Sequence, residues 1–173
     1  MSFLDEPFLE DDGEDHAAKG GHERLDLQAK IQQLVEGQSF AVLSTQGHGQ
    51  PYGSLVAYAM GEDMRFAAFA TLRATRKFRL LSECANVALV IDNRPDFPGE
   101  LMKIEAVTAT GKASLIEDDG EFDRWATLLT KRHPYLTHFV RSTSCGLFRV
   151  RIVRYLHVCR FQEVRQWIPD EGG

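Results

Sequence analysis

Residues 145–161 alternate between apolar and polar side chains, and this stretch constrains the fold more than any other. The apolar positions on one side are Phe148, Val150, Ile152, Leu156 and Val158, and the other side carries Arg149 and Arg151. Successive side chains of a β-strand point to opposite faces, so this pattern is typical of a long strand with one buried face. The sequence therefore predicts a protein built around a β-sheet.

Other segments of strand composition precede this one and are separated by turns rich in Gly, Pro, Asn and Asp. We expect strands at residues 40–45, 53–60, 64–70, 86–91 and 103–116, and a final short strand that reaches Trp167 and Pro169. Apolar residues at helical spacing predict helices at 24–36, within the basic stretch after residue 70, at 120–132 and shortly after Pro134. Hairpin connections do not fit βαβ winding. The expected fold is mainly β with α (α+β), an antiparallel β-barrel of six or seven strands with flanking helices.

Length and composition indicate one globular domain. The chain has 173 residues, of which 43% are hydrophobic and 26% charged, and its net charge of −5 argues against a nucleic-acid partner. No apolar run is long enough to span a membrane, and the N-terminus lacks the pattern of a secretory signal. The three cysteines, Cys84, Cys145 and Cys159, are widely spaced, which argues against a disulfide framework or a metal site. We therefore expect a cytoplasmic protein without a membrane partner.

Residues 1–22 differ in composition from the rest of the chain. Seven of them are Asp or Glu, and few are apolar. Such a segment can bury little surface, so we expect an acidic and mobile N-terminal arm, followed by one domain over residues 23–173.

Cations gather where the third expected strand ends and a helix begins, in the stretch ATLRATRKFRLL at residues 70–81. Arg73, Arg76 and Lys77 lie close to the first turn of this helix, where free backbone N–H groups and the helix dipole favour an anion. Thr75 adds a hydroxyl group beside them. The pattern predicts a binding site for a phosphate dianion.

A basic helix face in solvent, with its cations paired to Asp or Glu, is the alternative interpretation of this stretch. The preceding strand favours the anion site, because its side chains at Ala67, Ala68 and Ala70 are small. We expect them to leave space beside the cations in which a flat group can lie.

The order of these motifs resembles the pyridoxamine 5′-phosphate oxidase-like flavoproteins, the FMN-binding split barrels. A helix is followed by FAVLSTQGHGQPYGSLVAYA, then by MRFAAFATLRATRKFRLL and then by NVALVI. The closing segment FRVRIVRYLHVCRFQEVRQWIP is similar to the last strands of the family. The resemblance runs from about residue 25 to residue 169 and implies a split β-barrel.

The resemblance also implies the residues that bind FMN. Thr75, Arg76 and Lys77 match the turn that holds the FMN phosphate, and Thr71 ends the strand before it. The second strand would lie along the isoalloxazine ring, and a Trp near the C-terminus would approach the flavin of the partner subunit. The residues assigned to the cofactor in this way are Gly53, Ser54, Leu55, Val56, Thr71, Arg73, Thr75, Arg76, Lys77 and Trp167.

The function implied by the resemblance is that of an FMN-dependent oxidoreductase, a homodimer that acts on an unidentified small-molecule substrate or electron donor. A non-catalytic flavin- or haem-binding protein is the alternative, and relatives of this fold also use a deazaflavin. No residue is assigned a catalytic role. We expect His133 to form a helix cap or turn, and His157 to be an exposed strand residue.

Overall fold

The computed structural model describes residues 21–160 and 163–170. Helix α1 (Gly21–Gly37) begins the described part, three residues earlier than the predicted helix. The predicted acidic arm lies outside the described residues, except for residues 21 and 22, which belong to α1. No helix in the described ranges is long and apolar enough to cross a membrane.

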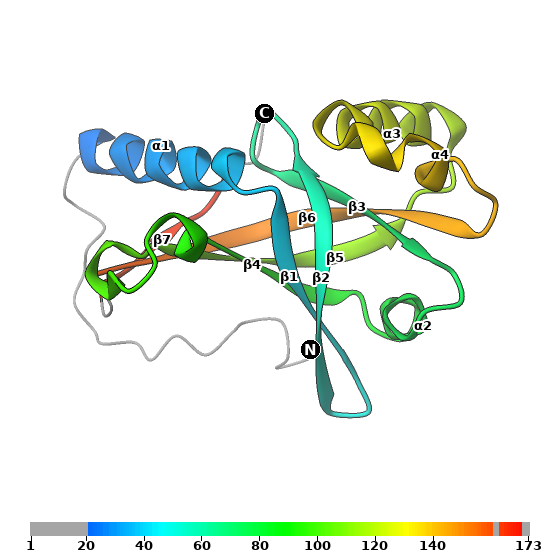
Figure 1. Ribbon diagram of the computed structural model, residues 1–173, viewed down its shortest axis with the longest axis horizontal. Helices are drawn as coiled ribbons and strands as arrows, with labels where there is room; N and C mark the ends of the chain where they lie inside the picture. The colour runs from blue at the N-terminus through cyan, green and yellow to red at the C-terminus, as the bar shows by residue number, and fades with distance from the viewer. Residues whose placement is uncertain (1–20, 161–162, 171–173) are drawn as a thin grey trace.

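Seven strands form one antiparallel sheet in the order β3-β2-β1-β4-β5-β6-β7, and β3 also pairs with β6. This additional pairing closes six strands into a barrel, with β7 attached to the free end of β6 (Figure 1). The strands are β1 (Phe40–Gly47), β2 (Gln50–Met60), β3 (Phe66–Leu72), β4 (Asn86–Asp92), β5 (Ala106–Leu115), β6 (Cys145–Cys159) and β7 (Glu163–Trp167). The predicted fold, an antiparallel barrel with flanking helices, is confirmed.

Three helical regions pack around the described barrel (Figure 1). Helix α1 contacts β4, β5 and β7, and α2 (Arg76–Glu83) contacts β1 and β3. Helix α3 (Asp119–Arg132) and the short α4 (Thr137–Val140) lie together and cover parts of β2, β3 and β6. On the outer face from β2 through β1 to β4, the side chains of Leu55, Val42 and Val90 belong to neither of the two buried groups described next.

The core consists of two groups of buried side chains. The larger fills the barrel and the space under α1, and its largest fully buried members include Tyr58, Tyr155, Phe69, Leu43 and Ile31. Both tyrosine hydroxyls find acceptors: Tyr58 donates to the carbonyl of Val35 at 2.6 Å and Tyr155 to that of Met64 at 2.5 Å. The smaller group lies between α3 and the sheet, around Trp125 and Leu129.

One prediction about the long strand is wrong. The register between β5 and β6 shifts between Thr110 and Gly111, because β6 has an extra residue, Val153, at a β-bulge. Beyond the bulge the faces exchange, so Tyr155 and His157 point into the core while Leu156 and Val158 turn outward. The long strand therefore has no single apolar face: Leu156 and Val158 lie on the opposite side of the sheet from Phe148, Val150 and Ile152.

Candidate functional site

Two threonine hydroxyls join the end of β3 to the start of α2. The Oγ1 atoms of Thr71 and Thr75 lie 3.1 Å apart. Thr75 donates its hydroxyl hydrogen to the carbonyl of Leu72 at 2.8 Å and accepts the backbone N–H of Phe78 at 3.3 Å. Thr75 is thus the N-cap of α2, as expected of a threonine with extended backbone before a helix. This arrangement fixes the direction in which the first turn of α2 points.

The predicted cations surround this first turn. Arg76 lies over the ring of Tyr52, 5.0 Å from the ring centroid, and Arg73 lies over the ring of Phe78 at 5.5 Å. Burial lowers the pKa of the Lys77 ammonium, because it removes water from the charged group. None of Arg73, Arg76, Lys77 or Arg79 forms an ion pair within the described residues. The described part of the chain therefore lacks the carboxylate pairing of the alternative interpretation, while Arg73, Arg76 and Arg79 are exposed to solvent, and the anion site stays a prediction.

Strand β2 has an open edge next to these cations. Its residues 50–57 pair with β1, but only Tyr58–Met60 pair with β3. Residues 51–57 consequently have no strand neighbour on the β3 side among the described residues, and half of their backbone donors and acceptors are not used in the sheet. Because Arg76 stacks on Tyr52, the cation cluster lies at one end of this open edge.

The predicted residues of β2 alternate between its two faces. Leu43, which is fully buried, is the cross-strand partner of Ser54, so Ser54 points inward, and Val56 beyond it belongs to the core. The hydroxyl of Ser54 is buried and has no hydrogen-bond partner in the described part of the chain. Gly53 and Leu55 are exposed on the outer face, with Leu55 65% exposed. The side chain of Leu55, the backbone of Gly53 and the backbone groups along the edge are therefore the parts of β2 that a ligand could reach.

Trp167 is the predicted site residue that the chain does not bring to this place. Its indole stacks on Tyr155 with ring centroids 5.2 Å apart, and the residue is only 4% exposed. Thr71 pairs with Gly146 at the start of β6, whereas Trp167 pairs with Tyr155, nine residues further along the strand. At about 3.3 Å per residue the two ends are roughly 30 Å apart. Any contribution of Trp167 to a flavin site has to come from a partner subunit, and it stays a prediction.

The small residues of β3 do not leave the predicted space. Ala68 has no exposed surface, and it packs with Trp125 and Leu129 of α3. Ala67 is equally buried in the barrel core. The expectation of room for a flat group on β3 is wrong, since α3 fills that side. The open edge of β2 lies on the other side of the cations.

Tyr52, His133 and His157 have roles outside the predicted site, and sequence reasoning anticipated only that of His133. The ring of Tyr52 stacks under the guanidinium of Arg76. The only sequence signal for this role was the position of Tyr52 directly after the Gly- and Pro-rich turn. His133 caps α3, as predicted, and its Nε2 lies 2.8 Å from the carbonyl oxygen of Tyr58. His157 is fully buried rather than exposed, with its Nε2 2.8 Å from a carboxylate oxygen of Glu105. The bulge explains the error, because it turns His157 inward.

The fold is that of a split β-barrel, and Arg73, Arg76 and Lys77 lie together where β3 leads into α2. A sequence profile of the family described as pyridoxamine 5′-phosphate oxidase matches residues 27–159. This match spans most of the chain, and the chain belongs to that family. No curated protein matches the chain.

Solved structures with the same fold include proteins with different cofactors. A haem-binding protein from Mycobacterium smegmatis superposes with a TM-score of 0.72 at 15% identity, over 81% of this chain and 57% of that one. The haem storage protein HutZ from Vibrio cholerae gives a TM-score of 0.64 at 16% identity, over 82% of this chain and 94% of that one. An FAD-binding protein from Mesorhizobium loti gives a TM-score of 0.59 at 15% identity, over 75% of this chain and 90% of that one. At these identities the likeness shows the fold alone, and the chain spans little more than half the length of the first of these proteins.

Proposed function

We propose that the protein is an FMN-dependent oxidoreductase that acts on a small molecule. The observation that carries the proposal is the group of unpaired cations at the first turn of α2, next to the open edge of β2. Arg76 and Lys77 supply charge, and the free N–H groups at the start of α2 supply directed donors for a phosphate group. Family membership supports this assignment.

The residues present fit the chemical parts of FMN. The phosphate would be held by Arg76, Lys77 and the N-terminal N–H groups of α2, with Arg73 close by. The polar edge of the isoalloxazine ring needs several hydrogen-bonding groups in a row, and the unpaired backbone of β2 offers them. The buried hydroxyl of Ser54, which lacks a partner, is a further polar group on this strand. When bound, FMN would supply the hydride and electron transfer, and the role of this chain would be to bind and orient it.

We further propose that the functional unit is a homodimer formed through the open outer face of the sheet. Leu55, Val42 and Val90 are cross-strand neighbours on this face, and Thr108 connects Val90 to Leu156. The outward turn of β6 after its bulge adds more apolar surface to the same face. Its most exposed members are Phe40, Leu55 and Val164. A contiguous apolar surface of this kind is typical of an interface, and a second copy can cover it by two-fold symmetry.

Non-catalytic haem binding is the second candidate, because two proteins with similar folds are described as haem-binding or haem-storing. The absorption spectrum of the purified protein separates the two candidates. Bound flavin gives two bands in the near-ultraviolet and blue, whereas haem gives an intense Soret band. Bleaching of the flavin bands by NADH or NADPH without oxygen would support an oxidoreductase. A protein that takes up haem and no FMN would overturn the proposal.

A further inference from the structure

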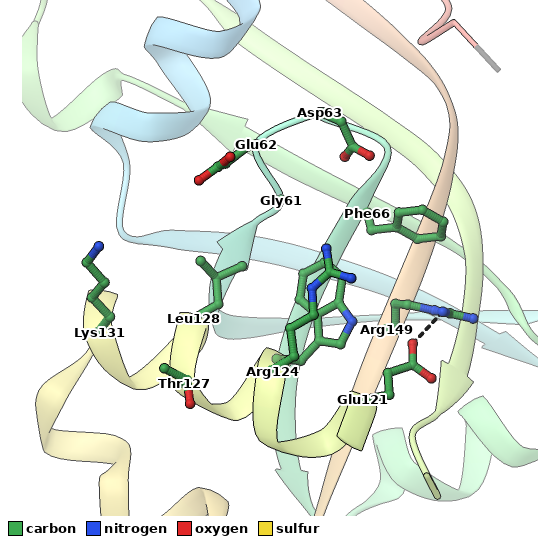
Figure 2. A pocket seen from close by; sticks show the side chains of 11 residues that line it. Gly61, Glu62, Asp63, Phe66, Glu121, Arg124, Thr127, Leu128, Lys131 and Arg149 are labelled. Carbon is green, nitrogen blue, oxygen red and sulfur yellow. Dashed lines mark hydrogen bonds and ion pairs between the residues drawn. The ribbon is translucent and has the colours of Figure 1, made fainter. Parts of the chain in front are cut away.

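A cavity lies on the opposite side of β3 from the barrel interior, between α3 and the turn that joins β2 to β3. Its volume is about 570 Å³, within the range of small-molecule sites (Figure 2). Phe66 and Trp125 line it with aromatic surface, in an edge-to-face pair with centroids 6.4 Å apart. Phe66 begins β3 and Thr71 lies near its end, so the cavity and the phosphate-binding turn are separated by roughly 17 Å of strand.

Opposite charges face each other across this cavity. Arg124 and Lys131 lie on the α3 side, and Glu62 and Asp63 lie on the turn (Figure 2). None of these four side chains forms an ion pair within the described residues. Among the described residues, Asp63 accepts only the backbone N–H of Arg65, at 3.0 Å. The two walls are therefore complementary in charge, and no ion pair joins them among the described residues.

Among the other residues that line the cavity, Trp125 holds Arg124 in place without neutralising its charge. Its guanidinium lies over the ring of Trp125, 5.6 Å from the centroid, so stacking holds the group while its N–H donors have no acceptor among the described residues. Arg149 differs, because it pairs with Glu121 at the end of the cavity nearest Phe66. Leu128 adds an apolar side chain between Arg124 and Lys131.

We propose that this cavity binds a small zwitterion that carries a carboxylate at one end, an ammonium group at the other and an apolar body between them, of the size of a dipeptide. The carboxylate meets Arg124 or Lys131 on the α3 wall, the ammonium group meets Glu62 or Asp63 on the turn, and the apolar body lies on Phe66 and Leu128. A ligand with both charges satisfies both walls at once, whereas an anion or a cation alone faces one repulsive wall. The proposal stands on this cavity and does not depend on flavin binding.

Calorimetric titration of the full chain with the dipeptide Leu-Phe tests the proposal. Two blocked forms serve as ligand controls: N-acetyl-Leu-Phe lacks the ammonium group, and Leu-Phe amide lacks the carboxylate. We expect saturable binding of the free dipeptide, and a loss of about tenfold or more in affinity when either charge is blocked.

Two pairs of substitutions test which wall of the cavity binds each charged group of the dipeptide. With Arg124→Gln and Lys131→Gln together, the free dipeptide and its amide should bind equally weakly. With Glu62→Gln and Asp63→Asn together, the free and N-acetylated forms should bind alike. Lys30→Gln with Asp26→Asn, an exposed ion pair on α1, is the matched control and should leave all affinities unchanged. Circular dichroism verifies that each variant is folded. Absence of saturable binding to the folded wild-type protein, or equal affinity for all three ligands, would overturn the proposal.

Discussion

The hydroxyl groups of Thr71 and Thr75 lie 3.1 Å apart, and this contact joins the last inward-facing residue of β3 to the N-cap of α2. Through it, the pairing of β3 with β6 determines where the first turn of α2 points. The cations of the proposed phosphate site are therefore anchored to the paired strands β3 and β6 and lie beside the open edge of β2, where the ligand is expected.

Thr75→Ala should weaken this junction. The substitution removes the acceptor for the Phe78 N–H and leaves the nearly buried Thr71 hydroxyl without a partner. We expect a loss of about 0.5–2 kcal/mol in the free energy of unfolding, the usual cost of losing a threonine N-cap. Urea denaturation measures it. Thr75→Ser keeps the hydroxyl and is the control; equal stability of the alanine and serine variants would contradict the capping role.

Lys77 should make the affinity for FMN depend on pH. Its pKa is lowered by burial, so its ammonium group loses its charge at a lower pH than an ordinary lysine, whose pKa is about 10.4. The FMN phosphate is already a dianion above about pH 7. Affinity should therefore fall as the pH rises from neutral towards 10, because the cation disappears while the anion remains.

The variant Lys77→Arg tests this dependence, because arginine stays charged over the whole range. Fluorescence titration with FMN at several pH values should give a flatter profile for Lys77→Arg than for the wild type. Identical profiles would show that Lys77 does not contact the phosphate.

Gly111 is required by the bulge in β6. A Cβ atom at position 111 would lie 2.2 Å from the carbonyl oxygen of Arg151, which is backbone and cannot move aside easily. Gly111→Ala should therefore lower the free energy of unfolding by about 1–3 kcal/mol, as overpacking does. At Gly37 a Cβ atom would meet nothing within 4 Å, so Gly37→Ala is the control. Unchanged thermal stability of Gly111→Ala would contradict the observed register.

Charge on the outer face should separate the proposed dimer. Val164→Glu changes a side chain that is 58% exposed, so the fold of one subunit should tolerate it. Burying a carboxylate in an apolar interface is costly, and we expect monomers where the wild type is dimeric. Light scattering measures the mass. Val153→Glu places a carboxylate at the bulge, on the same strand as Leu156. The mass of this variant shows whether a charge placed anywhere on β6 also separates the dimer. A wild type that is monomeric at micromolar concentration would refute the dimer.

The sequence contained enough information for the order and type of the elements. The helix starting near Thr75 could be predicted because a threonine N-cap and the Arg and Lys after it are local signals. The long strand was predicted as well, but its faces were not. Ile152 and Val153 are consecutive apolar residues, and this break in the alternation, together with Gly111 in the opposite strand, was the signal for the bulge.

The shape of the candidate site could not be predicted in the same way. Which edge of β2 lacks a neighbour depends on where β3 separates from it, and this is determined by pairing between distant segments. The stacking of Arg76 on Tyr52 and the burial of Trp167 against Tyr155 likewise join residues far apart in sequence. Composition and periodicity describe each segment alone, so they do not determine these contacts.

A comparison of FMN with riboflavin, which lacks the phosphate, tests the central claim most directly. We predict that FMN binds at least about 100-fold more tightly to the wild type, since each charged hydrogen bond contributes about 1.5–3 kcal/mol. This preference should disappear when Arg76 and Lys77 are both replaced by Ala, while Lys103→Ala, in an exposed ion pair with Glu100, should retain it. Equal affinities of the wild type for FMN and riboflavin would contradict the assignment of the α2 turn as a phosphate site.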